Sequence, residues 1–85
     1  MDTVWIYEAY EVEDYVVHTE VKVFKDEKSA RKFWKKRKKE ILNTSDVDYW
    51  KIETKKDKVL IYDKENPSEF CWEYSIKEYP IENIN

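Results

Sequence analysis

The spacing of apolar residues changes once along this chain, and that change limits the folds it can adopt. Between Asp26 and Leu42 they recur every three to four positions, the spacing of one side of an α-helix. Before and after this segment they alternate with polar residues or form short β-branched and aromatic runs, which is typical of strands. The sequence therefore predicts one helix between two groups of strands.

Five segments have the pattern of strands, two before the helix and three after it. They are residues 4–10, 15–24, 49–55, 59–63 and 70–77. The first has apolar residues on both parities, so we expect a central strand, or one with a face against a partner. Residues 11–14 form a polar link, residues 56–58 indicate a hairpin, and Pro67 suits the second position of a turn. The tail from Pro80 is expected to fray.

Length limits the architecture to one domain, residues 1–85, because a chain this short can support only one hydrophobic core. We predict an α+β fold: a two-layer antiparallel sheet of about five strands, order ββαβββ, with one helix packed on one face. The sequence contains no glycine. This excludes glycine-rich phosphate loops and predicts turns that use Asn, Asp and Pro or are longer than two residues.

The helix has a clear start, a buried side and an end. Asp26 is the expected N-cap, and the helix should end near Leu42, with Asn43 able to adopt a left-handed cap. The side facing the sheet follows the spacing i, i+3, i+4, i+7 and i+11. Its residues are Ala30, Phe33, Trp34, Arg37 and Ile41.

Charge is segregated along the chain. Eight of the sixteen basic residues lie within residues 28–39, which leaves eight basic residues against nineteen acidic ones elsewhere, a formal balance of −11. The basic helix, residues 27–42, is therefore a candidate binding surface for an anionic partner. Its candidate binding residues are Lys28, Arg31, Lys32, Lys35, Lys36 and Lys39.

Like charges four residues apart on this helix repel one another, at a cost of about 0.2 to 0.5 kcal/mol per pair. Acidic side chains of the sheet or of a second copy could offset the repulsion, or an anionic ligand such as a nucleic-acid backbone could do so. A lysine-rich helix face can also be simply solvated. The acidic surface formed by the rest of the chain leads to a separate hypothesis, in which it occupies the cationic groove of a nucleic-acid enzyme.

The sheet should have one face that the single helix cannot cover. We assign Trp5, Tyr7 and Tyr62 to this open face, where they would form an apolar patch typical of an interface. A homodimer or another protein partner is the expected occupant. The alternative is that strand twist and long Lys or Glu side chains cover these rings.

No residue set indicates catalysis, a metal or a cofactor. His18 is the one histidine, and Cys71, between two aromatic residues, is expected to act as a small buried hydrophobe. A single cysteine and the lack of a signal peptide predict a cytoplasmic location. The apolar runs are far shorter than the ~20 residues that span a bilayer, so we expect no membrane contact.

These observations lead to a functional expectation. The protein should be a small non-enzymatic binding or inhibitory module that acts on a macromolecular partner through its open aromatic face and its charged surfaces. An accessory or anti-defence protein of a mobile element is one setting for such a module. The alternative is a nucleic-acid-binding protein that uses the basic helix, and a small ribonuclease that uses His18 comes third.

Overall fold

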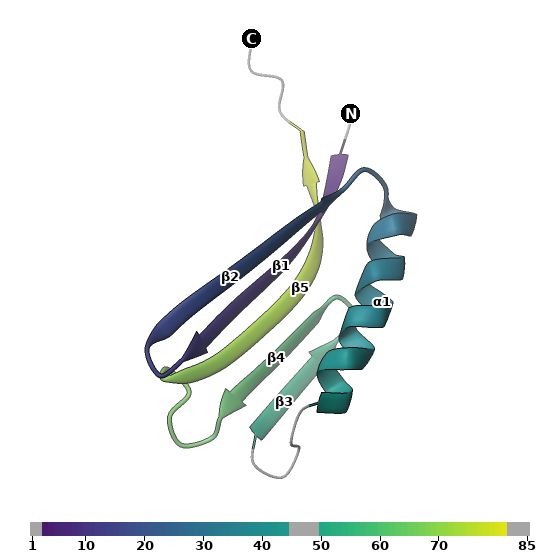
Figure 1. Ribbon diagram of the computed structural model, residues 1–85. Coiled ribbons are helices and arrows are strands. Elements are labelled where there is room, and N and C mark those ends of the chain that lie inside the picture. The colour runs from purple at the N-terminus through teal and green to yellow at the C-terminus, as the bar shows by residue number, and fades with distance from the viewer. Residues whose placement is uncertain (1–2, 45–49, 82–85) are drawn as a thin grey trace.

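The computed structural model describes residues 3–44 and 50–81 (Figure 1). One antiparallel sheet and one helix make up this part of the chain, in the predicted order ββαβββ. The elements are β1 (Thr3–Glu13), β2 (Val16–Phe24), α1 (Glu27–Thr44), β3 (Trp50–Lys55), β4 (Lys58–Asp63) and β5 (Phe70–Pro80).

The strands lie in the order β2-β1-β5-β4-β3, and all neighbours are antiparallel. β1 is a central strand, as predicted, while β2 and β3 are the two edges. α1 lies along one face of the sheet, here called the covered face, and the opposite face is the open face (Figure 1). The predicted two-layer α+β architecture is confirmed.

The ends of several elements differ from the prediction. β1 continues through Glu13, so residues 11–13 of the predicted polar link belong to the strand. α1 ends at Thr44, two residues later than expected. Pro80 still pairs with Thr3 at the end of β5, while residues 82–85, in the predicted frayed tail, lie outside the described residues. Tyr49, the predicted start of the third strand, also lies outside them.

The start of α1 is fixed by the predicted N-cap. The Oδ1 atom of Asp26 accepts a hydrogen bond from the backbone N–H of Ser29 at 2.7 Å, which satisfies a donor that the first turn would leave free. This hydrogen bond favours the ionised carboxylate and lowers the pKa of Asp26. Glu27 follows in the first turn, where a negative charge suits the helix dipole.

Aromatic rings from β1 and α1 form the centre of the core. Tyr7 is fully buried and Trp34 is 4% exposed. The ring of Phe33 meets that of Tyr7 edge-on, with centroids 4.9 Å apart, and the Trp34 ring lies 6.2 Å from Tyr7. Edge-to-face contacts of this kind match the positive ring edge of one residue to the negative ring face of the other. Large rings thus give a short chain enough buried apolar surface for one core.

The connection from β4 to β5 uses polar side chains where the sequence predicts a turn. The buried carboxylate of Asp63 accepts hydrogen bonds from the backbone N–H groups of Glu65 and Asn66, at 2.8 and 3.2 Å. The carbonyl of Asn66 in turn accepts from the N–H of Glu69 at 3.2 Å. Pro67 is the second residue of that turn, as predicted, because its fixed φ suits the position.

The β1–β2 hairpin closes with a two-residue turn that lacks glycine. Asp14 and Tyr15 have φ angles of 50° and 66°, both in the left-handed region. Positive φ at both central residues defines the type I′ turn, whose twist matches that of the flanking strands. The expectation of a longer polar link at residues 11–14 is therefore wrong. Tyr15 takes a conformation that costs a side-chain-bearing residue about 1 to 2 kcal/mol.

Replacing Tyr15 by glycine should stabilise the protein. The ring is 75% exposed, so little packing is lost, while the left-handed strain disappears. The greater freedom of glycine in the unfolded chain cancels part of the gain, which leaves about 0.5 kcal/mol and a rise in Tm of about 2 to 4 °C. Thermal unfolding followed by circular dichroism measures this shift. A Tm below that of the wild type would contradict the turn geometry.

Candidate functional site

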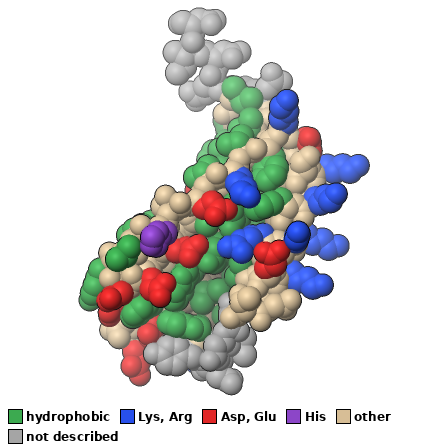
Figure 2. All heavy atoms as spheres, in the orientation of Figure 1, with side chains coloured by type: hydrophobic (Ala, Val, Ile, Leu, Met, Phe, Trp, Pro, Cys, Tyr) green, Lys and Arg blue, Asp and Glu red, His purple; other side chains and the backbone are tan. Residues whose placement is uncertain are grey.

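Five exposed lysines form the most distinctive surface of the described structure. They lie on the side of α1 that faces away from the sheet, and Figure 2 shows basic side chains projecting in a row along the helix. Four of them follow the spacing i, i+4, i+7 and i+11, so they form a line about 16 Å long at 1.5 Å per residue. We call this surface the lysine ridge, and it consists of Lys28, Lys32, Lys35, Lys36 and Lys39.

No lysine of the ridge forms an ion pair in the described structure, although the charge of Lys28 contributes to the lowered pKa of Asp26. Ion pairs within residues 3–44 and 50–81 involve Arg31, Arg37 and Lys58, and none reaches a ridge lysine. Ion pairs with acidic side chains of the same chain therefore do not offset the repulsion between these five lysines. Their charges point into solvent and are available to a ligand.

Arg31, the sixth predicted binding residue, has a structural role in this fold. Its Nη1 atom donates to Oδ1 of Asp57 at 2.9 Å, and its Nε atom lies 3.4 Å from Oε1 of Glu27. The guanidinium also lies 5.0 Å from the Trp5 ring. The hydrogen bond to Asp57 raises the pKa of Arg31. These contacts join the first half of α1 to the β3–β4 turn.

Two further cations of the helix are directed inward. The Nε atom of Arg37 donates to the hydroxyl of Tyr7 at 3.1 Å, and this hydrogen bond raises the pKa of Arg37. Lys38 donates to the carbonyl oxygens of Lys55 and Lys56, at 2.9 and 3.4 Å. The basic helix thus has two kinds of cation: those that fasten it to the sheet and those of the lysine ridge.

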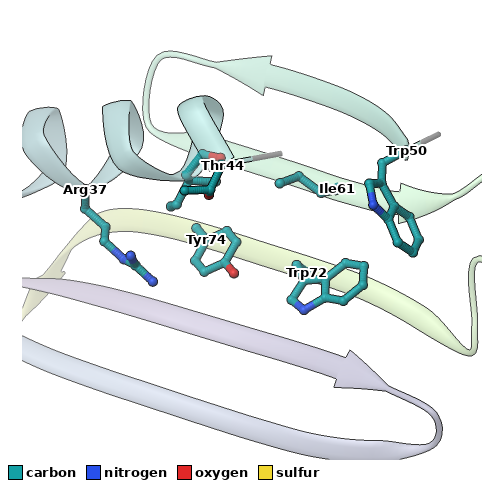
Figure 3. A pocket seen from close by; sticks show the side chains of 7 residues that line it. Arg37, Thr44, Trp50, Ile61, Trp72 and Tyr74 are labelled. Atoms are coloured by element: carbon teal, nitrogen blue, oxygen red, sulfur yellow. The ribbon is translucent and has the colours of Figure 1, made fainter. Parts of the chain in front are cut away.

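A second feature is a cavity of about 250 Å³ between the C-terminal half of α1 and the covered face, here called the aromatic groove. Figure 3 shows the rings and the Arg37 side chain around it. The rings of Trp50 and Trp72 meet edge-on, with centroids 4.9 Å apart. The groove is lined by Arg37, Ile41, Thr44, Trp50, Ile61, Trp72 and Tyr74.

Acidic residues border the aromatic groove on the sheet. In the strand register Glu11 lies beside Trp72, and Glu20 lies beside Ala9, which itself pairs with Tyr74. Acidic side chains gather over the β1–β2 hairpin in Figure 2. This border disfavours phosphate in the groove and leaves it suited to an apolar or aromatic group. The sequence prediction did not single out Trp50 or Trp72 as site residues.

Tyr74 gives this region a measurable pH dependence. Burial raises its pKa to about 12, and the charge of Glu11 adds to the shift. A tyrosine in an unfolded chain titrates near 10, so between about pH 10 and 12 the unfolded state loses this proton while the folded state keeps it. Tyr74 thus contributes its full stability below about pH 10, and this contribution is lost as the pH rises toward 12.

We expect the free energy of unfolding to fall by about 1 to 2 kcal/mol across that window, allowing for solvent that reaches the groove. Urea unfolding at pH 9.5 and above, compared with Tyr74→Phe, measures the effect. The variant should lose less stability than the wild type as the pH rises. Burial also raises the pKa of Tyr7, so part of the slope should remain. Identical alkaline profiles for the two proteins would contradict the assignment to Tyr74.

The structure corrects two of the three residues predicted for the open face. Trp5 and Tyr7 are only 8% and 0% exposed, because α1 packs on the side of β1 to which their side chains point. Tyr62 does lie on the open face, since its register partner is Lys51, away from the buried Ile61. Its ring lies 6.0 Å from the Lys51 ammonium, and its hydroxyl donates to Glu53.

On the rest of the open face, charged side chains lie over the aromatic rings, as in the alternative that the sequence left open. The hydroxyl of Tyr79 donates to Glu8 at 2.9 Å, and its ring lies 5.4 Å from the Lys77 ammonium. Lys58 forms an ion pair with Glu73 on the same face. This face is therefore not a continuous aromatic patch. Its exposed apolar side chains are concentrated instead on β1 and β2, as Tyr10, Val17, Val21 and Val23.

The two residues weighed for catalysis lie apart from any built site. His18 is exposed on β2 and pairs with Glu11 in the strand register. Cys71 is free and half-buried, and burial raises the pKa of its thiol, the opposite of activation. Within residues 3–44 and 50–81, no group of three or more His, Cys, Asp or Glu side chains could hold a metal ion.

The fold and surfaces together define a small two-layer α+β domain with a basic outer helix. The chain matches no protein-family model, and comparison with curated proteins and with solved structures finds no significant similarity. No helix in the described part of the chain is long and apolar enough to cross a membrane.

Proposed function

We propose that this protein is a non-enzymatic module that binds the backbone of nucleic acids through the lysine ridge. The observation that supports this proposal is the row of five exposed lysines that form no ion pair in the described structure. Lysines arranged in a line can each neutralise a phosphate and release its condensed counterions. A cytoplasmic location, which gives access to nucleic acid, is part of the proposal.

The composition of the ridge favours phosphate over a protein partner. Protein interfaces are enriched in aromatic residues and arginine and depleted in lysine. The ridge consists of lysine alone, while the aromatic residues and both arginines of α1 contact the sheet. A protein partner on the open face has less support than the sequence indicated, because Trp5 and Tyr7 are buried.

The same geometry predicts binding that does not depend on base sequence. Contacts to phosphate fix position but carry no sequence information, and lysine binds phosphate as a point charge. The acidic residues over the β1–β2 hairpin repel phosphate, so the contact is confined to the strip along α1. Five contacts at most correspond to a slope of log K against log salt of about −4.5 for a duplex.

Fluorescence anisotropy with labelled duplex and single-stranded DNA and RNA tests the proposal. At about 50 mM salt the protein should bind these probes with little preference among sequences. Raising the salt to about 200 mM should weaken duplex binding by roughly 10² to 10³-fold. No binding at the lower salt, or binding that does not change with salt, would refute the proposal.

A further inference from the structure

The edge strand β2 is exposed along almost its whole length. Eight of its nine residues, Val16 to Val23, are exposed, and only Phe24 is half-buried. Val17, Val21 and Val23 are 51%, 61% and 63% exposed, although β-branched residues in strands usually pack against neighbours. An edge strand also has backbone N–H and C=O groups that point away from the sheet without a strand partner.

The other edge, β3, lacks these properties. It has six residues instead of nine, and its open-face residues are Lys51, Glu53 and Lys55. Short edge strands with lysine resist pairing with another chain. Long strands with exposed β-branched residues and no proline favour such pairing. β3 therefore has the properties of an edge protected against pairing, and β2 has those of an edge that pairs with another chain.

We propose that β2 pairs antiparallel with β2 of a second copy of this chain, which joins the two sheets into one ten-stranded sheet. A two-fold axis perpendicular to the sheet relates the copies, so the covered faces lie on the same side. Both helices, and hence both lysine ridges, then lie on that side. The inference rests on β2 and does not require the proposed nucleic-acid function.

The charges of β2 select one register. On the covered face the central residues are Glu20 and Lys22. Centring the pairing on Val21 places each Glu20 opposite Lys22 of the partner subunit, and this ion pair occurs twice. On the open face Val21 then faces its own symmetry mate and Thr19 faces Val23 of the partner subunit. The register thus combines opposite charges on one face with β-branched pairs on the other.

Other registers that keep the faces aligned are less favourable. Centring on Glu20 or on Lys22 places two like charges directly opposite each other, which is destabilising. Centring on Thr19 places Glu20 opposite His18 of the partner subunit. That register also places Lys22 opposite Val16 of the partner subunit, so neither Lys22 faces a carboxylate. Charge complementarity therefore favours Val21 as the centre.

Light scattering coupled to gel filtration, without nucleic acid, gives the first test. The wild type should have twice the 10.5 kDa mass of the chain. Glu20→Lys or Lys22→Glu alone replaces two attractive pairs by two repulsive ones, and each should raise the dimer Kd about tenfold or more. The double exchange Glu20→Lys with Lys22→Glu should restore the dimer, which also controls for the loss of the Lys22 contact with Phe33.

Oxidative cross-linking gives the second test and reads the register. In a Cys71→Ser background, Val21→Cys should form a disulfide-linked dimer, because the two new thiols face each other across the axis. Thr19→Cys, equally placed on the open face, should not cross-link, because its symmetry mate is four residues away along the strand. Both substitutions are at exposed positions, so folding should be retained.

Three outcomes would overturn the proposal. A wild type that is monomeric at 100 μM would exclude the dimer. A dimer that persists unchanged in both single charge variants would place the interface elsewhere, for example on the open face. Cross-linking at position 19 in place of 21 would refute the register. A failure of nucleic-acid binding would produce none of these three outcomes, so the dimer and the nucleic-acid proposal are tested separately.

Discussion

Replacing Lys32 and Lys35 by glutamate should remove nucleic-acid binding and at the same time raise the thermal stability of the protein. The substitutions lie at the centre of the lysine ridge and leave two negative charges among three positive ones. Each lost phosphate contact lowers the salt slope by about one, so at 50 mM salt we expect affinity to fall by roughly 100-fold or more. Anisotropy titrations with a duplex probe at two salt concentrations measure both quantities.

The stability gain follows from the helix spacing. In the wild type the pairs 28/32, 31/35, 32/36 and 35/39 are like charges at i, i+4. The double variant converts all four into opposite-charge pairs, each changing by about 0.4 kcal/mol or more. Because Arg31 already pairs with Glu27 and Asp57, we expect about 1 to 2 kcal/mol in total, and a rise in Tm of about 5 to 10 °C.

A matched control separates the ridge from net charge. Lys51→Glu with Lys77→Glu changes the net charge by the same amount, but both residues are exposed on the open face. This variant should keep most of the binding. If the two double variants lost affinity equally, the binding would depend on overall charge and the lysine ridge would not be the site. If the ridge variant were destabilised, its lysines would have partners that the fold does not show.

The element order of the fold could be read from the sequence because local signals agreed. The spacing of Ala30, Trp34 and Ile41 identified the buried side of the helix, and all three are buried. Asp26 was recognisable as an N-cap from its position before the helical spacing. Such signals depend on residues close together in the chain. Element ends were less certain, because strand pairing extended β1 and β5 beyond their local patterns.

The placement of the aromatic residues on the two faces could not be predicted in the same way. Both parities of β1 carry apolar residues, so the pattern alone does not say which parity faces the helix. Packing against Phe33 decides it, and Tyr7 lies on the chosen side. The aromatic groove depends on the strand order, because Trp50 and Trp72 come from strands separated by β4. Neither fact is determined by local sequence.

The lysine ridge, by contrast, was predictable because it depends only on helix position. The residues that face away from a buried helical stripe follow from its 3.6-residue period. Arg31 is the exception, since its tertiary contact with Asp57 lies 26 residues away in the chain. The sequence alone could not show that β2 is an exposed edge, because this depends on the order of the strands in the sheet. The same order places β3, with its charged residues, at the opposite edge.

Trp34→Ala should cause the largest loss of stability among single substitutions in the core. The side chain is 4% exposed, packs beside Tyr7, and its Nε1–H donates to the carbonyl of Lys56 at 3.0 Å. Truncation leaves a cavity and removes the shorter of the two hydrogen bonds to the carbonyl of Lys56, so we expect a loss of about 3 to 5 kcal/mol. This is a large part of the roughly 5 to 15 kcal/mol of a typical domain. Urea unfolding measures the loss.

Trp72→Ala is the matched control, because Trp72 is only half-buried beside the aromatic groove. It should cost about 1 to 2 kcal/mol, since less packing is lost and the groove already admits solvent. Equal losses for the two variants would contradict the docking of α1 over β1. That docking buries Tyr7 and turns the opposite side of the helix, with the lysine ridge, toward solvent. The Trp34 and Trp72 variants therefore test the geometry on which the binding proposal depends.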